Sequence, residues 1–387
     1  MQPFVFNTVP QLICRPGSAL QLADSCRRLG VSKPLLVTDP GLVAIGLVQP
    51  VLAALDAEGL PAILFDQVRE DPPEATVEAA AAVGREAGVD GVIAVGGGSS
   101  MDVAKVVAVL LGGSQPLASL YGVDQVQGGR LPMILVPTTA GTGSEVTPVA
   151  VITTGETTKA GVSSAVLLPD VAVLDAELTL GLPPAVTAMT GVDAMVHAIE
   201  AYTSKVKKNP LSDNLAREAL RLLGTHIRAA VHTGSDREAR AGMLLGACLA
   251  GQAFANAPVA AVHALAYPLG GHYHIPHGLT NSLVLPSVLA FNMPDAAPLY
   301  AELAEILVPG VSGGVEARAA ALVVAIRGLI DDVRLPATLQ AAGVPEQDLP
   351  MLAEDAMLQQ RLLVNNPREV ALADALDIYR AAYGATA

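Results

Sequence analysis

Four of the chain's seven histidines lie in one apolar stretch, "HALAYPLGGHYHIPHG" at residues 263–278. They are His263, His272, His274 and His277. Imidazole nitrogens are common ligands of transition metals, and an uncompensated charge among apolar residues is costly. No spacing within the stretch makes a complete metal site by itself, so these histidines need a partner segment from elsewhere in the chain.

A second segment, "TGVDAMVHAIEAYTS" at residues 190–204, offers that partner. Asp193 and His197 lie four residues apart, so on a helix they share one face, about 6 Å apart along the axis. With His263 and His277 they provide one carboxylate and three imidazoles, which can surround a divalent metal at about 2.0–2.2 Å. This ligand set suits Fe, Zn, Co or Ni better than Mg or Ca. The alternatives are an exposed ion pair and surface histidines, and the apolar flanks disfavour both together.

A run of glycines joins a predicted strand to a predicted helix in "GVIAVGGGSSMDVAKVV". Gly96, Gly97 and Gly98 let the backbone approach a ligand closely, and a helix that begins at Ser99 or Ser100 offers free N–H groups to an anion. A diphosphate fits this geometry, whereas the alternative is a tight turn that binds nothing. The G-x-G-x-x-G pattern of standard Rossmann units is absent, and so is a Walker loop.

Other polar side chains are expected at the same edge of the predicted sheet. Asp39 closes the strand "LLVTD", where a carboxylate can accept hydrogen bonds from a ribose diol and would repel a 2′-phosphate. Taken alone, an aspartate in this position is more often a turn former or a helix cap. The loop "PTTAGTGSEVTP" follows another strand and adds the hydroxyls of Thr138, Thr139, Thr142 and Ser144.

The elements that must position these residues change character along the chain. In the first half, short β-branched runs alternate with helical patterns, which predicts crossover units and a parallel sheet covered on both faces. The predicted strands are residues 34–39, 62–65, 91–97, 133–139 and 171–175, and the predicted helices between them are 74–88 and 100–113. After Pro183 and Pro184 only helical patterns follow, at residues 187–204, 212–231, 238–254 and 315–333. The sequence therefore predicts an α/β domain over residues 1–183 and an all-helical domain over residues 184–387.

Composition excludes several classes of protein. The chain is 51% apolar and only 16% charged, which disfavours extensive disorder, and its net charge of −14 argues against a nucleic-acid partner. Three cysteines far apart are typical of buried thiols in a reducing compartment. No secretory signal is visible, and polar residues interrupt the apolar stretch 242–271, which indicates a buried helix pair rather than a membrane span. We therefore expect a cytoplasmic protein that has no membrane contact.

The chain resembles one known family nearly from end to end, the iron-containing (group III) alcohol dehydrogenases. The blocks that match occur in order and are "GGGSSMDVAK", "PTTAGTGSEVT", residues 182–202, "HALAYPLGGHYHIPHG" and "NNPREV". The resemblance implies a dehydroquinate synthase-like architecture, with an N-terminal dinucleotide-binding α/β domain and a C-terminal helical domain. It also implies a catalytic Fe²⁺, with Zn²⁺ as the alternative, and its ligands would be Asp193, His197, His263 and His277. We further expect a homodimer or a higher homo-oligomer.

The same resemblance implies contacts for the cofactor and the substrate. The residues expected to hold the cofactor are Gly97, Gly98, Ser99, Asp102, Thr138, Thr139, Thr142 and Lys159. Asp39 would then favour NAD over NADP, and Phe254 falls where the family lines its substrate pocket.

Two positions depart from the family pattern. Many members have a histidine four residues after the third ligand, often assigned to proton transfer, and this chain has Tyr267. Proton transfer must therefore run through the tyrosine hydroxyl, through His272 or His274, or through water. The family's "PNP" is here "EDPPE", so Asp71 replaces an amide on the nicotinamide side of the cofactor site. We count Tyr267 and the ligand His277 as the catalytic residues.

Together these features predict a metal-dependent oxidoreductase that moves hydride between NAD(H) and a small alcohol or aldehyde. The metal would act as a Lewis acid on the substrate oxygen, so no covalent nucleophile is required. One alternative is a dehydroquinate synthase-type lyase, which would want a basic pocket for a phosphorylated substrate, whereas few Lys or Arg residues lie near the candidate ligands in the sequence. A second is a maleylacetate reductase-like enzyme, which typically lacks the full metal set and also wants positive charge for its acidic substrate.

Overall fold

The computed structural model describes residues 3–155 and 158–384. The chain forms two compact units. One is Asn7–Leu180, and the other comprises the segment before Asn7 together with the chain from Gly181 onward. The first unit is α/β and the second is helical, so the predicted fold class is confirmed.

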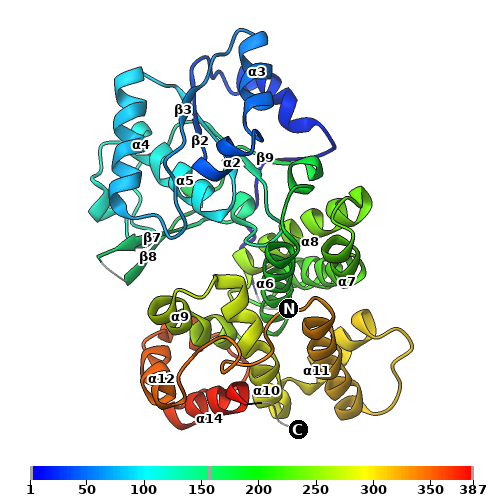
Figure 1. The fold of residues 1–387 in the computed structure, drawn as a ribbon. Helices are drawn as coiled ribbons and strands as arrows, with labels where there is room; N and C mark the ends of the chain where they lie inside the picture. The colour runs from blue at the N-terminus through cyan, green and yellow to red at the C-terminus, as the bar shows by residue number, and fades with distance from the viewer. Residues whose placement is uncertain (1–2, 156–157, 385–387) are drawn as a thin grey trace. The chain divides into compact units, whose positions relative to one another are not determined.

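The first unit is built on a six-stranded sheet whose neighbouring strands are all parallel (Figure 1). The strand order is β1-β9-β6-β4-β2-β3. The bounds are β1 (Gln11–Cys14), β2 (Pro34–Val37), β3 (Ile63–Phe65), β4 (Gly91–Gly96), β6 (Met133–Pro137) and β9 (Val171–Leu174). All five predicted strands are present. The sixth, β1, was not predicted; it has only four residues, lies at the edge of the sheet and is only partly buried.

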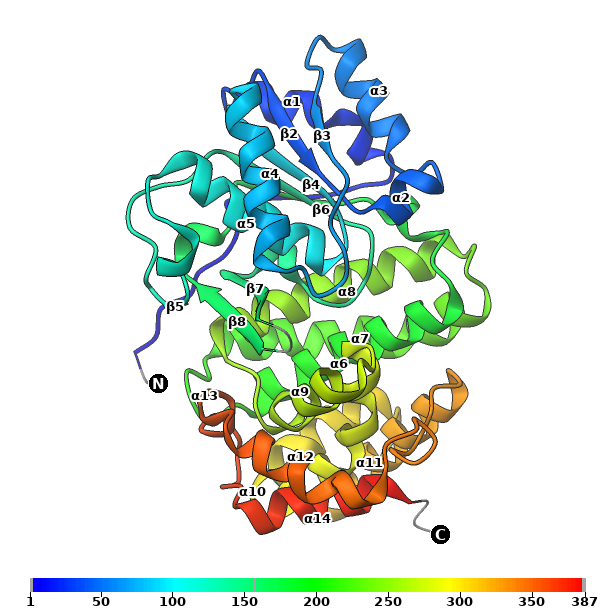
Figure 2. The ribbon, with the colours of Figure 1, turned by 60° about the vertical axis from the view of Figure 1, so that its left-hand side comes forward.

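Helices cover both faces of this sheet because successive side chains of a strand point to opposite faces. Leu35 and Val37 of β2 pack with apolar residues of α4 and α5, whereas Leu36 between them packs with residues of α1 and α3. Figure 2 shows α4 and α3 on different sides of the strands. The helices of the unit are α1 (Leu22–Arg28), α2 (Pro40–Ala44), α3 (Gln49–Ala57), α4 (Glu74–Ala87) and α5 (Gly98–Gly112).

The sheet has a topological switch point between the neighbouring strands β2 and β4. The chain leaves β2 through α2 and α3 on one face to reach β3, and it leaves β4 through α5 on the other face to reach β6 on the opposite side. Ligands of open parallel sheets bind outside the carboxyl ends of the strands at such a point. Asp39 and Gly97 follow β2 and β4 there, so the fold brings two predicted cofactor residues to a favoured place for a ligand.

A smaller second sheet in this unit was not predicted. Its order is β5-β8-β7, with β7 and β8 antiparallel and β5 parallel to β8. The strands are β5 (Gly122–Val123), β7 (Val149–Thr154) and β8 (Thr158–Ser163). Short 3-10 helices connect the larger elements at η1 (Ser18–Gln21), η2 (Leu117–Ser119), η3 (Ser144–Val146), η4 (Ala165–Leu167) and η5 (Ala176–Thr179).

The second unit is a bundle of helices around α6, which packs against α7, α8 and α10. Its helices are α6 (Pro184–Thr203), α7 (Pro210–His232), α8 (Arg237–Asn256), α9 (Ala261–Tyr273), α10 (His277–Leu307), α11 (Val315–Asp332), η6 (Glu346–Asp348), α12 (Leu349–Met357), α13 (Gln360–Leu363) and α14 (Leu372–Tyr383). No strand occurs among its described residues, and all four predicted helices are present. The 31-residue α10 was missed because it contains Pro286, Pro294 and Pro298, which normally end a helix.

The apolar stretch predicted to be a helix pair is formed by the end of α8 and by α9, which meet at a bend of 107°. Among the described residues, no single helix has the length and apolar character needed to cross a membrane, and this bent pair meets the criterion only jointly. Most of α9 is buried against the bundle, so its apolar residues are accounted for by packing.

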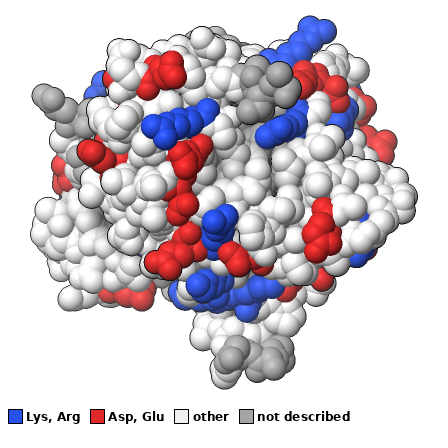
Figure 3. Space-filling model, turned by 90° about the horizontal axis from the view of Figure 1, so that it is seen from below, with Lys and Arg blue, Asp and Glu red and all other residues white. Residues whose placement is uncertain are grey.

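One face of the second unit shows how charges are distributed. Figure 3 shows Lys and Arg side chains lying beside Asp and Glu side chains over this face. Arg228 lies 2.8 Å from Asp332, and Arg380 lies 3.1 Å from Asp377. Surface pairs of this kind contribute little to stability, about 0–1 kcal/mol each.

Candidate metal and cofactor sites

Asp193 and His197 lie on α6, the most buried helix of the bundle. Every residue from Gly191 to Thr203 is buried, so this part of α6 has no solvated face on which polar side chains could be hydrated. A Cβ on Gly191 would lie 2.6 Å from the Met243 side chain, which shows how closely the helices approach. Asp193 and His197 are only 2% and 5% exposed, and His197 Nε2 lies 3.9 Å from Asp193 Oδ1. Buried polar groups of this kind require partners.

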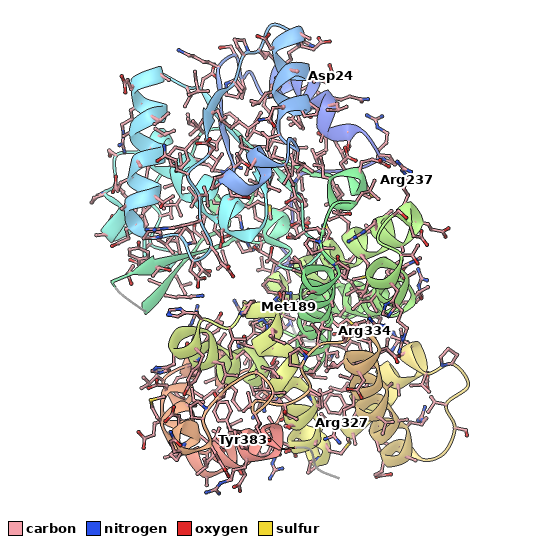
Figure 4. The ribbon with its side chains drawn as sticks, viewed as in Figure 1. Asp24, Met189, Arg237, Arg327, Arg334 and Tyr383 are labelled. Carbon is pink, nitrogen blue, oxygen red and sulfur yellow. The ribbon has the colours of Figure 1, made fainter. Side chains whose placement is uncertain are left out.

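His263 and His277 reach Asp193 from two other helices. His263 is the third residue of α9, and His277 is the first residue of α10. Gly278 brings the start of α10 against α6, because a Cβ there would lie 2.4 Å from the carbonyl oxygen of Met189, which Figure 4 labels on α6. His277 Nε2 lies 3.8 Å from Asp193 Oδ1.

The structure brings the four predicted metal ligands together. Ligand atoms of Asp193, His263 and His277 all lie within 4.8 Å of one another. The fourth predicted ligand, His197, joins them through Asp193, and its ring stacks on the His263 ring with the ring centres 4.9 Å apart. Atoms bound to one ion at about 2.0–2.2 Å can be separated by up to about 4 Å, so a small inward shift of the ligands would accommodate a cation.

The polar contacts inside this cluster also fit a cation. The Asn281 amide nitrogen lies 2.6 Å from Asp193 Oδ1 and 3.3 Å from Nε2 of both His263 and His277. One amide has two N–H groups for these three atoms, so it cannot donate to all of them at once. Burial alone would raise the pKa of Asp193, but the surrounding imidazoles and the Asn281 amide hold that pKa below its usual value. Asp193 is therefore a carboxylate, as a metal ligand must be.

Phe254 and Tyr267, predicted at the substrate and proton-transfer positions, both lie beside the cluster. The Phe254 ring stacks on His197, with the ring centres 4.4 Å apart. The Tyr267 ring centre lies 5.8 Å from that of His277 and 6.4 Å from that of His263.

The other two histidines of the opening stretch have different surroundings. His272 Nε2 lies 2.6 Å from Asp355 Oδ2 at an exposed position. His274 ends α9 in the left-handed conformation, with φ 52°.

The glycine run in the first unit contains glycines of two kinds. Gly97 precedes α5, and the first N–H groups of α5 have no partner within the helix. Gly98 is required by the fold, because a Cβ there would lie 2.9 Å from the Thr142 side chain. Gly97 has ordinary backbone angles, and a Cβ would meet nothing closer than Thr139, at 3.7 Å. The protein itself therefore does not require glycine at position 97, whereas a ligand held close to the backbone would.

The hydroxyl loop after β6 is fixed to α5 by a buried polar network. Lys105 is fully buried and donates to Ser144 Oγ and to the Val149 carbonyl, both at 2.7 Å. Asp102, predicted to contact the cofactor, accepts from Ser144 Oγ at 2.6 Å and from the Val151 backbone N–H at 2.9 Å. Burial lowers the pKa of Lys105 to about 8 and raises that of Asp102. In the structure Asp102 therefore positions the loop that carries Thr138, Thr139 and Thr142.

The remaining predicted cofactor residues lie at the ends of other strands. Asp39 accepts from the Leu42 backbone N–H at 3.0 Å and so caps α2, as the alternative interpretation expected. Asp71 has a left-handed backbone, with φ 49°, and its carboxylate lies 2.5 Å from Lys159 Nζ on β8. Two residues predicted to contact the cofactor thus form an ion pair with each other.

Comparison with known proteins decides the family. Residues 10–176 match the model described as iron-containing alcohol dehydrogenase, and residues 187–383 match that of the C-terminal region of the same family. A long-chain-alcohol dehydrogenase of Geobacillus thermodenitrificans is 44% identical over 96% of this chain and 94% of its own length. The chain belongs to the iron-containing alcohol dehydrogenase family. The resemblance seen in the sequence is confirmed.

Solved structures of family members agree over the whole chain. A 1,3-propanediol oxidoreductase is 36% identical, with a TM-score of 0.95, and the match covers 99% of this chain and 100% of that one. A sulfoacetaldehyde reductase from Bifidobacterium kashiwanohense, solved in complex with NAD⁺, is 29% identical, with a TM-score of 0.90 and full coverage of both chains. The protein is therefore a metal-dependent oxidoreductase of alcohols and aldehydes that uses NAD(H), and iron and NAD are its cofactors.

Glu200 lies against His263, one of the predicted iron ligands, and was not among the residues that the sequence singled out. It follows Asp193 by seven residues, so the same helix face presents both, and it is 4% exposed. Its Oε2 lies 2.6 Å from His263 Nδ1. The signal in the sequence was a second acidic residue after Asp193 in a largely apolar helix, but the residue that it contacts is 63 positions away.

We predict that Lys105→Met destabilises this dehydrogenase strongly. The variant removes the hydrogen bonds that the buried amine donates to Ser144 Oγ and to the Val149 carbonyl, and loss of a buried donor typically costs about 1–3 kcal/mol of unfolding free energy for each acceptor left unsatisfied. Because the pKa of Lys105 is lowered in the folded protein, the unfolded chain binds more protons between pH 8 and 10.5, so wild-type stability gains from this group as the pH rises. Denaturant unfolding at pH 7 and at pH 10 should show a larger difference between wild type and variant at pH 10.

The control for Lys105→Met is Lys33→Met, which removes an exposed lysine of the same unit. It should change the unfolding free energy by less than about 0.5 kcal/mol at either pH. Equal stability of Lys105→Met and wild type would contradict the role of Lys105 in fixing the hydroxyl loop to α5.

Proposed function

We propose that this enzyme oxidises uncharged primary alcohols, and reduces the corresponding aldehydes, at an iron site made by Asp193, His197, His263 and His277. The convergence of one buried carboxylate and three imidazoles from α6, α9 and α10 is the observation that carries the proposal. We further propose that residues 1–183 are the dinucleotide-binding domain and residues 184–387 the metal- and substrate-binding domain.

The roles of the ligands follow from their chemistry. When bound, the iron supplies a Lewis acid that lowers the pKa of an alcohol, and NAD supplies the hydride acceptor. Asp193 contributes a negative charge that offsets part of the charge of the cation, and three imidazoles keep the site selective for transition metals. Fe²⁺ is the expected ion, and Zn²⁺ would suit the same donors.

Most of the residues that we propose for the cofactor follow the carboxyl ends of the neighbouring strands β2, β4 and β6. The free N–H groups at Gly98 and Ser99, with Gly97 before them, suit the cofactor's diphosphate. Asp39 is placed to accept bonds from a ribose diol and to repel a 2′-phosphate, which supports NAD over NADP. Polar contacts are assigned to the remaining side chains, namely Asp71, Asp102, Thr138, Thr139, Thr142 and Lys159.

The substrate is proposed to lack charge. The side chains in contact with the ligands include Phe254, Tyr267 and Asn281, which are uncharged, and Glu200, which would repel an anion. The names of this enzyme's relatives refer to different compounds, among them a long-chain alcohol, 1,3-propanediol and sulfoacetaldehyde. A sulfonate would want a cation near the metal, so an alkyl alcohol suits these residues better than sulfoacetaldehyde does.

The enzyme is further proposed to be a cytoplasmic homodimer or larger homo-oligomer. Cys26 and Cys248 are buried and take part in no disulfide, which supports a reducing compartment. The edge strand β1 offers unpaired backbone groups to which a second copy of the chain could bind.

The first prediction from this proposal concerns the metal and the reaction. Purified protein loaded with Fe²⁺ or Zn²⁺ should bind roughly one ion per chain. It should oxidise primary alcohols with NAD at a kcat/KM about tenfold or more above that with NADP, which corresponds to about 1.4 kcal/mol. His263→Ala and His277→Ala should lose metal and turnover but still bind NAD by calorimetry, while the control His232→Ala, at an exposed histidine of α7, keeps all three properties. Stoichiometric metal in both ligand variants would contradict the site.

A second prediction separates ligand binding from folding at the glycine run. Gly97→Ala should weaken NAD binding about tenfold or more, because the added methyl group would occupy space needed by the diphosphate. Its unfolding free energy should stay within about 0.5 kcal/mol of wild type, since the site tolerates a Cβ.

The matched control is Gly129→Ala, where a Cβ would meet nothing within 4 Å. It should leave both quantities unchanged. Gly112→Ala, where a Cβ would lie 2.5 Å from the Arg130 backbone, should destabilise the fold. Unchanged NAD binding by Gly97→Ala would show that the diphosphate lies elsewhere.

A third prediction concerns Tyr267 as the group that passes a proton to or from the substrate. Tyr267→Phe should lower kcat about tenfold or more while metal content and NAD affinity stay at wild-type values, because only the hydroxyl is removed. Tyr267→His, which restores the commoner family residue, should recover most of the rate. Unchanged turnover in Tyr267→Phe would assign proton transfer to His272, His274 or water.

A further inference from the structure

The carboxylate of Glu200 binds two different groups of α9 at the same time. Its Oε2 lies 2.6 Å from His263 Nδ1, and its Oε1 accepts from the Val262 backbone N–H at 2.7 Å. Glu200 is 4% exposed and His263 is 3% exposed, so water does not compete for either bond. One buried side chain of α6 therefore connects the start of α9 and the imidazole that α9 presents to the metal site.

The contact between Glu200 and the Val262 backbone N–H replaces a helix cap. The residue before α9 is Ala260, which has no side-chain acceptor for the free N–H groups of the first turn. Glu200 provides that acceptor from a different helix. A carboxylate at this position is also favoured by the positive end of the helix dipole. The start of α9 is thus fixed relative to α6, which carries Asp193 and His197.

The contact between Glu200 and His263 decides which nitrogen of His263 faces the other ligands. A carboxylate only accepts hydrogen bonds, so His263 Nδ1 must carry the proton that it donates to Glu200. In the neutral imidazole the lone pair then belongs to Nε2. That atom is the one 3.3 Å from the Asn281 amide, in the cluster with Asp193 and His277. The tautomer that a metal requires is therefore present when Glu200 is in place.

We propose that Glu200 is a positioning residue of the metal site, which holds His263 in the tautomer with a free Nε2 and anchors the helix that carries it. This inference rests on the proposed function in taking His263 as a ligand. Outer partners of metal-bound histidines typically contribute 10–100-fold to metal affinity.

Glu200→Gln is the informative variant because it keeps the shape of the side chain and removes one acceptor. The amide oxygen can accept from Val262 N–H or from His263 Nδ1, but the NH₂ group then faces the other donor. Keeping the helix cap turns the NH₂ toward His263, which favours the tautomer with its proton on Nε2. Metal binding would then require loss of that proton.

The experiment first compares metal-free proteins by ¹⁵N NMR of histidine at pH 8. Wild type should show His263 with its proton on Nδ1, and Glu200→Gln should shift the population toward Nε2. Chelator competition with Zn²⁺ should then give a dissociation constant raised about 10–100-fold in the variant. Glu200→Asp, which retains both acceptors on a shorter stem, should recover part of the affinity.

The matched control is Glu302→Gln, which removes an acceptor of Tyr202 in the same unit. It should leave both the His263 tautomer and the Zn²⁺ affinity at wild-type values. A role of Glu200 in folding alone would lower the melting temperature of metal-free Glu200→Gln without changing the tautomer, and that result would overturn the inference. Absence of Zn²⁺ binding by wild type would instead contradict the proposed function, and the tautomer measurement would still decide the role of Glu200.

Discussion

A carboxylate buried in the middle of a helix bundle is the constraint on which the second unit depends. Asp193 is 2% exposed, and an isolated charge in such a place would destabilise the fold by several kcal/mol. The compensating groups come from different helices, His197 from α6, His263 from α9, and His277 with Asn281 from α10. Folding therefore has to bring three helices to one point. The group of acceptor atoms that results suits a divalent cation better than it suits the protein's own N–H donors.

Polar residues that are neither proposed ligands nor catalytic groups fix the positions of these helices. The connection between α8 and α9 is held by Ser204, which donates to the Pro258 carbonyl at 2.8 Å, and by Asn365, which donates to the Val259 carbonyl at 2.9 Å. Glu200 continues this series at the start of α9. Asn365 lies in the "NNPREV" block, and the next residue, Asn366, exchanges two hydrogen bonds with Asn292 of α10. A block that matched the family in sequence therefore acts by fixing α9 and α10, which carry two of the ligands.

Sequence periodicity predicted the elements whose own residues determine them. The strands β2, β4 and β6 carry continuous apolar runs, and the pair Asp193 and His197 follows helical spacing, so both were found. The long helix α10 was missed because its prolines oppose helix formation locally, and burial of its apolar residues in the bundle outweighs that preference. Glu200 was missed because its meaning lies in a contact 63 residues away. The glycine run was found, but only the structure distinguishes Gly98, which the fold requires, from Gly97, which it does not.

The departure at position 71 illustrates how one substitution can preserve the backbone and change the electrostatics. Asp71 adopts a left-handed conformation, which both Asn and Asp tolerate, so the backbone does not distinguish it from the amide of the family pattern. The charge does, because the carboxylate lies 2.5 Å from Lys159 Nζ, whereas an amide would leave that cation uncompensated. Both side chains are partly exposed, at 53% and 33%, so the pair contributes little to stability. The difference is in the charge pairing: in this chain Lys159 pairs with a carboxylate of the protein itself.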